Sequence, residues 1–249
     1  MKSVILCEGG TDLTLIQYFM EVANGWVYNK DDNAGIKVGK SRKAFLHDED
    51  YLLIAQTGGC TKLCPCLNKL ITLIKRAGNT AELIDKIVII SDRDEFDSAV
   101  NFIDDINNLL GAYQVEVLNQ MQENQWVKCN IENDVKEVVS FEIMLLLIPF
   151  ETTGALETFL LEAVAKSDDY DKNLIVKGTQ FVDTIDPEKK YLTKRRHKTK
   201  AKFDIYFSIR TPVEQFSERQ NILRNINWEE YEHIQESFKM LKELHTNRN

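Results

Sequence analysis

Two short apolar runs in this sequence end abruptly in acidic residues, and they constrain the fold more than any other feature. The first, Val4–Cys7, leads into Glu8, and the second, Ile87–Ile90, leads through one serine into Asp92 and Asp94. Apolar runs without polar alternation are typical of buried parallel strands. In open α/β sheets the functional crevice lies at the carboxyl ends of such strands. The sequence therefore predicts a sheet with these carboxylates gathered at one edge.

The first 165 residues alternate between strand-like and helix-like patterns, which predicts an α/β fold with a mostly parallel sheet and helices on both faces. The expected strands are 3–7, 51–56, 86–91 and 141–149. The expected helices are 11–22, 63–77, 98–110 and a fourth that follows residues 153–157 and runs to about residue 166. Residues 26–50 are polar and irregular, and we interpret them as a small hairpin insertion. Two stretches, 114–119 and 125–131, have the pattern of short strands in an antiparallel insertion.

The last third of the chain is patterned differently. Residues 167–187 are polar and loosely patterned, and they are the best candidate for a boundary or hinge. A basic segment follows, and apolar spacing predicts a C-terminal helix over 228–244. We therefore expect an α/β domain over 1–165, and a C-terminal basic segment and helix over 166–249 that packs on the first domain.

Composition favours a folded cytoplasmic protein. A hydrophobic content of 43% supports a real core, and no apolar run is long enough to span a membrane. The chain enters its first strand directly after Met1-Lys2-Ser3, without the pattern of a signal peptide. Five cysteines, an odd number at uneven spacing, favour a reducing compartment over a disulfide framework.

Positive charge is concentrated in one segment of an acidic chain. The net charge is −8, yet residues 189–202 hold eight Lys or Arg and no Asp or Glu. Such a segment can bind a phosphate backbone locally. The alternative interpretation is a solvated loop that balances the acidic remainder. The candidate nucleic-acid-binding residues are Lys194, Arg195, Arg196, Lys198, Lys200 and Lys202.

Two motifs resemble a phosphate-binding loop and a zinc site, but each lacks features that such a site requires. Gly35–Ser41 looks like a phosphate-binding loop, but it has one residue too few between the glycines and no apolar strand before it, so a surface loop is favoured. Cys60, Cys64 and Cys66 match no standard zinc spacing and lack an obvious fourth ligand, which favours ordinary core or near-surface cysteines.

The acidic residues at the strand ends have the chemistry of a site for a hard cation. Asp92 and Asp94 alternate just past a strand, so both can face the same crevice. Asp12 lies four residues after Glu8, in the first turn of a helix. Converging carboxylates repel one another unless a cation neutralises them, and oxygen-only donors suit Mg²⁺ or Mn²⁺. The alternative is a helix start with favourable acidic residues and a solvated acidic loop.

At these residues the sequence resembles the Toprim domain. Glu8-Gly-Gly-Thr-Asp12 after the first strand and Asp92-Arg-Asp94 after the third look like the two signatures of that domain, over roughly residues 1–165. The resemblance implies acid/base or metal-binding chemistry for Glu8, and Mg²⁺ binding by Asp92 and Asp94. It is greatest to small standalone Toprim proteins and to overcoming-lysogenization-defect (OLD) nucleases. Similarity to that nuclease branch adds Asp12 and, within Gly154-Ala-Leu-Glu157, Glu157 as metal ligands, although Glu157 is equally an ordinary helix-start residue.

Among the activities of Toprim proteins, hydrolysis requires the fewest structural parts beyond the Toprim domain itself. A topoisomerase needs a large body with a nucleophilic tyrosine, and a primase needs a polymerase core and usually a zinc ribbon. Hydrolysis of a phosphodiester needs a water and two cations about 3.5–4 Å apart. The resemblance therefore implies a Mg²⁺-dependent nuclease acting on RNA or DNA, in which one lysine of the basic segment stabilises the transition state.

Partners and alternatives follow from the same resemblance. Similarity to related nucleases suggests a role in phage defence and control by a separate ATPase, because this chain has no usable phosphate loop of its own. The main alternative is a non-catalytic Toprim-like module that binds nucleotide, nucleic acid or a partner protein. A further alternative is nucleotidyl transfer, which would lengthen a substrate instead of shortening it.

Overall fold

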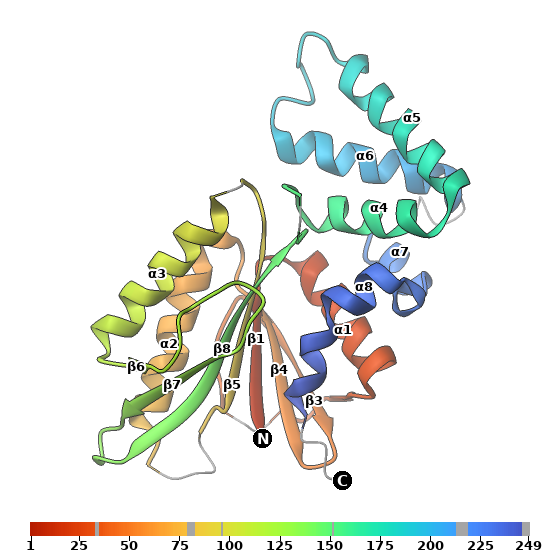
Figure 1. The fold of residues 1–249 in the computed structure, drawn as a ribbon. Coiled ribbons are helices and arrows are strands. Elements are labelled where there is room, and N and C mark those ends of the chain that lie inside the picture. The colour runs from red at the N-terminus through yellow and green to blue at the C-terminus, as the bar shows by residue number, and fades with distance from the viewer. Residues whose placement is uncertain (33–34, 79–82, 96, 151, 213–218, 246–249) are drawn as a thin grey trace. The chain divides into compact units, whose positions relative to one another are not determined.

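The computed structural model describes residues 1–32, 35–78, 83–95, 97–150, 152–212 and 219–245 (Figure 1). These divide into two compact units. The first unit comprises residues 1–92, 96–147 and 240–249, and the second comprises residues 93–95 and 148–239. The units do not coincide with the predicted segments 1–165 and 166–249, because the helix that begins at residue 156 packs with the helices that follow it.

An eight-stranded sheet forms the centre of the first unit, in the order β2-β3-β4-β1-β5-β8-β7-β6. The predicted strands at 3–7, 51–56, 86–91 and 141–149 are confirmed as β1, β4, β5 and β8. The bounds are β1 Lys2–Cys7, β2 Val27–Asn29, β3 Ser41–His47, β4 Asp50–Gln56, β5 Lys86–Asp92, β6 Glu116–Val117, β7 Val127–Glu132 and β8 Val138–Ile148.

The prediction of a mostly parallel sheet is wrong. β1 pairs in parallel with β4 and β5, but β2–β3, β3–β4, β6–β7 and β7–β8 are all antiparallel. The reason is the length of the connections, since a two-residue turn after His47 and a five-residue turn after Glu132 can close only hairpins. The hairpin expected within 26–50 and the antiparallel insertion expected within 114–131 are confirmed, and together they outweigh the parallel centre.

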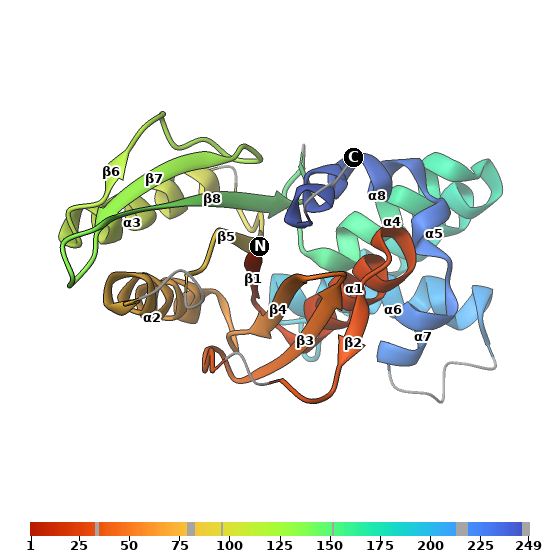
Figure 2. The same cartoon turned by 90° about the horizontal axis from the view of Figure 1, so that it is seen from below.

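Helices cover both faces of this sheet, as predicted. They are α1 Gly10–Asn24, α2 Leu63–Arg76 and α3 Ser98–Ala112, with a short 3₁₀ turn, η1 Cys60–Lys62, before α2. Val4 and Leu6 of β1 belong to one apolar cluster with α2 and α3. The helix α1 lies on the opposite face of the sheet, where Phe19 is buried (Figures 1 and 2). Alternate residues of β1 thus serve two cores, which explains why the strand is apolar throughout.

The end of the chain from residue 240 also belongs to the first unit. There the Ser3 hydroxyl lies 3.5 Å from the carbonyl oxygen of Leu244, and Lys86 Nζ lies 3.7 Å from a carboxylate oxygen of Glu243. His245 stacks on His47 with ring centroids 4.4 Å apart. These contacts fix the terminal segment on residues that belong to three different strands.

The second unit is helical. Its elements are α4 Leu156–Ser167, α5 Asp169–Ile185, α6 Arg195–Arg210, α7 Arg219–Asn225, η4 Trp228–Glu230 and α8 Glu232–Ser237. The expected hinge at 167–187 is therefore wrong, because most of that segment is α5, which Asp168 caps by accepting the backbone N–H of Asp171 at 2.9 Å. The single helix expected over 228–244 is also wrong. It is replaced by η4, α8 and a further 3₁₀ segment, η5 Lys239–Leu244.

Candidate functional site

The carboxyl ends of β1, β4 and β5 meet at one edge of the first unit, and Glu8 lies at their centre. The register that pairs Cys7 with Ile90 brings the next residue, Glu8, beside Ser91. Glu8 Oε1 accepts a hydrogen bond from Ser91 Oγ at 2.5 Å and another from the backbone N–H of Asp92 at 3.0 Å. The two acidic motifs, some 80 residues apart in the sequence, are therefore in direct contact through Glu8 and Asp92.

The backbone of Glu8 is held by the turn that follows β4. Its carbonyl oxygen accepts the N–H groups of Gly58 at 2.9 Å and Gly59 at 3.0 Å. Both glycines have positive φ, +93° and +127°, which side chains strongly disfavour. Thr57 supports the turn, because its hydroxyl oxygen lies 3.2 Å from the carbonyl oxygen of Cys7. Backbone and side chain of Glu8 are thus both fixed before any ligand arrives.

Asp12 has a local structural role. Its Oδ2 accepts the backbone N–H of Gly9 at 2.6 Å, which satisfies one of the free donors at the start of α1. A carboxylate in the first turn of a helix is also stabilised by the helix dipole. This contact holds the Asp12 carboxylate against the backbone that links Glu8 to α1.

The edge of the sheet carries concentrated negative charge. Burial raises the pKa of the Cys7 thiol well above its usual value, and the charges of Asp12 and Glu8 raise it further. Among the residues that the structure describes, Glu8 forms no ion pair, although its side chain is only half-buried. A carboxylate held by neutral donors, with further acidic groups beside it, attracts cations.

Asp94 is exposed and lies two residues beyond β5, in the segment 93–95 that belongs to the second unit. Its neighbour Arg93 is buried there. Arg93 donates from its backbone N–H to the carbonyl of Ile148 at 2.7 Å and from Nε to that of Pro149 at 2.9 Å. Its own carbonyl accepts the N–H of Gly154 at 2.8 Å. Arg93 therefore fixes the loop that carries Asp94 to the segment that leads into α4.

Glu157 is buried in the first turn of α4 and forms an ion pair. Its Oε1 accepts a hydrogen bond from Lys200 Nζ of α6 at 2.8 Å. Only 6% of the glutamate side chain is exposed, against 45% of the lysine. The structure thus brings together two residues that the sequence suggested separately, Glu157 as a weak metal ligand and Lys200 as one of the basic candidates.

The six basic candidates lie at the start of α6 Arg195–Arg210 or directly before it, and two of them form ion pairs. Lys194 is the N-terminal cap residue of α6, and the other five lie within its first eight residues. Lys200 pairs with Glu157, and Lys202 Nζ lies 3.0 Å from Asp183 of α5. Part of the positive charge of this segment is therefore balanced within the second unit, by Glu157 of α4 and Asp183 of α5. Arg195 and Arg196 are exposed, and Lys198 is half-buried.

We expect removal of this ion pair, in which only the glutamate is buried, to destabilise the second unit. Lys200→Met keeps the aliphatic stem but takes the ammonium from a buried carboxylate, so the free energy of unfolding should fall by about 1–3 kcal/mol in chemical denaturation. Lys194→Met, an exposed change at the N-terminal cap of the same helix, should alter it by less than about 0.5 kcal/mol. Adding Glu157→Gln to Lys200→Met should recover part of the loss, and a purely additive double variant would contradict a coupled pair.

Sequence reasoning missed Ser91, and it identified the turn at Gly58-Gly59 without its role in holding Glu8. Ser91 is 2% exposed and supplies the shortest hydrogen bond to Glu8, yet in sequence it looks like an ordinary strand-end serine. The available signal was positional, since Ser91 and Gly58-Gly59 immediately follow apolar runs of the same sheet, as Glu8 does. Among the described residues, no group of three or more His, Cys, Asp or Glu side chains is arranged to hold a metal ion.

The fold and this edge define an α/β protein with an acidic strand-end site and a separate helical unit. None of the helices within the described ranges is both long enough and apolar enough to cross a membrane. The chain belongs to the family described as a protein of unknown function, DUF3226, whose model matches residues 2–246.

Two solved structures are similar to the chain at low identity. The crystal structure of hypothetical protein PH0156 from Pyrococcus horikoshii OT3 is 16% identical, covers 96% of this chain and 99% of its own, and has a TM-score of 0.47. The structure of lactoylglutathione lyase from Agrobacterium tumefaciens is 11% identical, covers 57% and 92%, and has a TM-score of 0.16. No curated protein matches the chain. At these TM-scores neither likeness bears on function.

Proposed function

We propose that this protein is a Mg²⁺- or Mn²⁺-dependent nuclease of the Toprim type, with Glu8 and Asp92 at its centre. One observation supports the proposal above all others. Glu8, with no ion pair among the described residues, accepts the backbone N–H of Asp92 at the carboxyl ends of adjacent parallel strands. This is the edge at which open α/β sheets bind ligands.

The donor set fits a hard cation. Carboxylate and hydroxyl oxygens are the donors here, and Mg²⁺ prefers oxygen. Mg²⁺ also keeps several of its waters, so one or two protein carboxylates and the substrate phosphates are enough to hold it. A closed group of three ligands is therefore not required. Glu8 and Asp92 would hold the cation, with Asp12 and Asp94 as further candidates, and the cation would polarise a phosphoryl oxygen.

The chain's own residues contribute position and charge. Ser91 and the Asp92 N–H fix Glu8 Oε1, so its carboxylate is oriented before substrate binds. Lys198 and Arg195 on α6 are candidates to bind the phosphates of a nucleic acid, and Lys200 is less suited because it pairs with Glu157. A separate ATPase partner and a role in phage defence remain part of the proposal, on the resemblance alone.

A cleavage assay with matched variants tests the proposal. We expect the protein to shorten RNA or DNA with Mg²⁺ or Mn²⁺ and not with EDTA. Asp92→Asn should lower the rate at least about 100-fold and weaken Mn²⁺ binding in calorimetry. Asp134→Asn, an exposed change in the turn between β7 and β8, should alter neither. Absence of cleavage on every substrate together with absence of Mn²⁺ binding would contradict the nuclease and favour a non-catalytic module, whereas lengthened products would indicate nucleotidyl transfer.

A further inference from the structure

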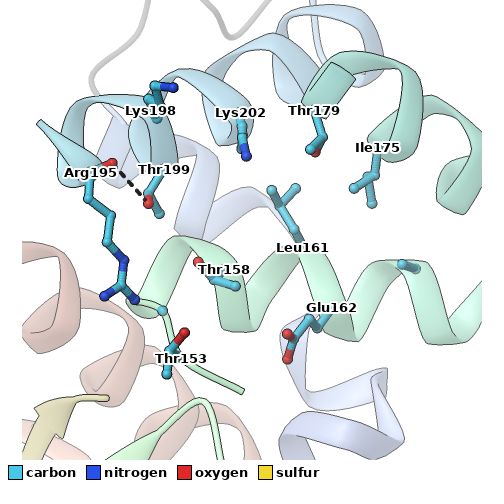
Figure 3. Close-up of a pocket in the computed structure, with 12 residues that line it drawn as sticks. Thr153, Thr158, Leu161, Glu162, Ile175, Thr179, Arg195, Lys198, Thr199 and Lys202 are labelled. Atoms are coloured by element: carbon cyan, nitrogen blue, oxygen red, sulfur yellow. Dashed lines mark hydrogen bonds between the residues drawn. The ribbon is translucent and has the colours of Figure 1, made fainter. Parts of the chain in front are cut away.

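A cavity of about 390 Å³ lies within the second unit, among three helices (Figure 3). Its lining residues come from α4, α5, α6 and the two residues Thr153 and Gly154 that precede α4. All three pairs of these helices pack on one another, so the cavity is framed by helices in mutual contact. The volume falls within the range of small-molecule sites, about 300–1,000 Å³.

One wall of the cavity is cationic. Arg195, Lys198 and Lys202 line it from α6, and their spacing of three and four residues puts them on one face of the helix. Arg195, Thr199 and Lys202 extend from α6 towards α4 (Figure 3). Lys202 is balanced by Asp183 at 3.0 Å, which leaves Arg195 and Lys198 as the main positive charges of the wall.

The other groups of the cavity limit where an anion can bind. Leu161 of α4 and Ile175 of α5 provide an apolar wall, with Ala165 beside them. Among the described residues that line the cavity, Glu162 is the one acidic side chain, and its Oε1 accepts the hydroxyl of Thr152 at 2.6 Å. Asp186 is near Lys198, but its pKa is held low mainly by hydrogen bonds from the backbone N–H groups of Leu192 and Tyr191. An anionic group therefore fits beside Arg195 and Thr199, away from Glu162.

We propose that this cavity binds a nucleoside phosphate, either free or as the 5′ end of a strand. The phosphate would contact Arg195, Lys198 and the Thr199 hydroxyl, and the base would pack against Leu161, Ala165 and Ile175. The combination of a cationic wall with an apolar wall matches a molecule that has a charged end and a flat, weakly polar end. The choice of a nucleoside phosphate over other phosphorylated compounds rests on the proposed function.

Calorimetry in EDTA tests the site without catalysis. The probes are AMP, inorganic phosphate, and a short oligonucleotide with either a 5′-phosphate or a 5′-hydroxyl. We expect AMP to bind more tightly than inorganic phosphate. A free-nucleotide site would bind AMP and not distinguish the oligonucleotides, whereas a strand-end site would prefer the phosphorylated oligonucleotide at least about tenfold. Failure of both AMP and the phosphorylated oligonucleotide to bind at millimolar concentration would overturn the proposal.

Three variants distinguish binding of AMP inside the cavity from attraction of AMP by positive charge alone. Arg195→Ala should weaken AMP binding at least about tenfold, and Arg196→Ala, which removes the same charge one residue away and outside the cavity, should change it less than about twofold. Ala165→Phe changes no charge but fills the apolar end, and it should weaken AMP binding as much as Arg195→Ala does. Equal losses in Arg195→Ala and Arg196→Ala, with no loss in Ala165→Phe, would show charge alone and overturn the site.

The same measurements show whether the cavity proposal or the nuclease proposal has failed. Thermal melting of each variant establishes that it folds, and cleavage with Mg²⁺ is measured in parallel. Intact metal-dependent cleavage without binding of either AMP or the 5′-phosphorylated oligonucleotide would overturn the cavity proposal and leave the nuclease. AMP binding sensitive to Arg195→Ala and Ala165→Phe, in a protein that cleaves nothing, would support the cavity and contradict the nuclease.

Discussion

Replacing Glu8 with glutamine should lower metal-dependent cleavage by about 100- to 1,000-fold while the protein stays folded. The amide oxygen of glutamine can still accept the hydrogen bonds that Ser91 and the Asp92 N–H donate to Oε1. The variant therefore removes the negative charge and little else. Because the charge is what would attract a divalent cation, Mn²⁺ affinity measured by calorimetry should fall together with the rate.

Comparison of Glu8→Gln with Glu8→Ala shows whether Glu8 acts as a metal ligand or only as a structural residue. Alanine removes the charge and both hydrogen bonds, so it should also cost about 1–3 kcal/mol of stability by leaving polar groups of β5 unsatisfied. We expect Glu8→Gln to melt within about 2 °C of the native protein. If Glu8→Gln cleaved normally, or if its activity fell only in proportion to a loss of folded protein, Glu8 would have no role in metal chemistry.

Gly39→Ala should give the largest stability loss among simple glycine substitutions. A Cβ at Gly39 would lie 2.5 Å from the carbonyl oxygen of Gln56, at the end of β4, and this oxygen also accepts the Lys40 N–H at 2.7 Å. The glycine also has φ +76°, which alanine adopts only with strain. We expect the free energy of unfolding to fall by more than about 2 kcal/mol in chemical denaturation.

Gly35 provides a matched control within the same segment. Its φ is +74°, almost equal to that of Gly39, but an added Cβ would meet nothing within 4 Å. Gly35→Ala should therefore cost only the backbone strain, about 1–2 kcal/mol. Similar losses of unfolding free energy in the two variants would mean that the close approach of Gly39 to Gln56 does not contribute to stability. These glycines belong to the segment that imitates a phosphate-binding loop, and Gly39 serves instead to bring that segment against β4.

The parallel centre of the sheet could be predicted because its pattern is strong. β1, β4, β5 and β8 are nearly continuous apolar runs, and a strand buried on both faces has no other common composition. The flanking strands are harder to predict. β2 has three residues and β6 has two, so both strands are too short to show an alternation of polar and apolar side chains in the sequence. Their pairing depends on turns such as that at Asn124, between β6 and β7, where φ is +59°, and these turns are set by tertiary context.

The helical unit was less accessible to sequence reasoning for a different reason. The helix α5 is mostly half-buried or exposed, with only Gly178 and Val182 buried, so its apolar stripe is narrow and its sequence resembles a loop. For the candidate site, the contact between Glu8 and Asp92 follows from strand order and could be anticipated. The pairing of Glu157 with Lys200 could not, because it depends on how α4 and α6 pack across 43 residues of chain.

The path of the chain between the two units limits how this protein can be divided. It changes unit after residues 92, 95, 147 and 239, so each unit is assembled from separate stretches of sequence. A gene fragment ending at residue 147 would deprive the Arg93 guanidinium of its acceptor on Pro149, and a fragment beginning at residue 148 would lose Arg93 altogether. We therefore expect that neither unit can be expressed as an autonomous fragment without redesign of its junctions.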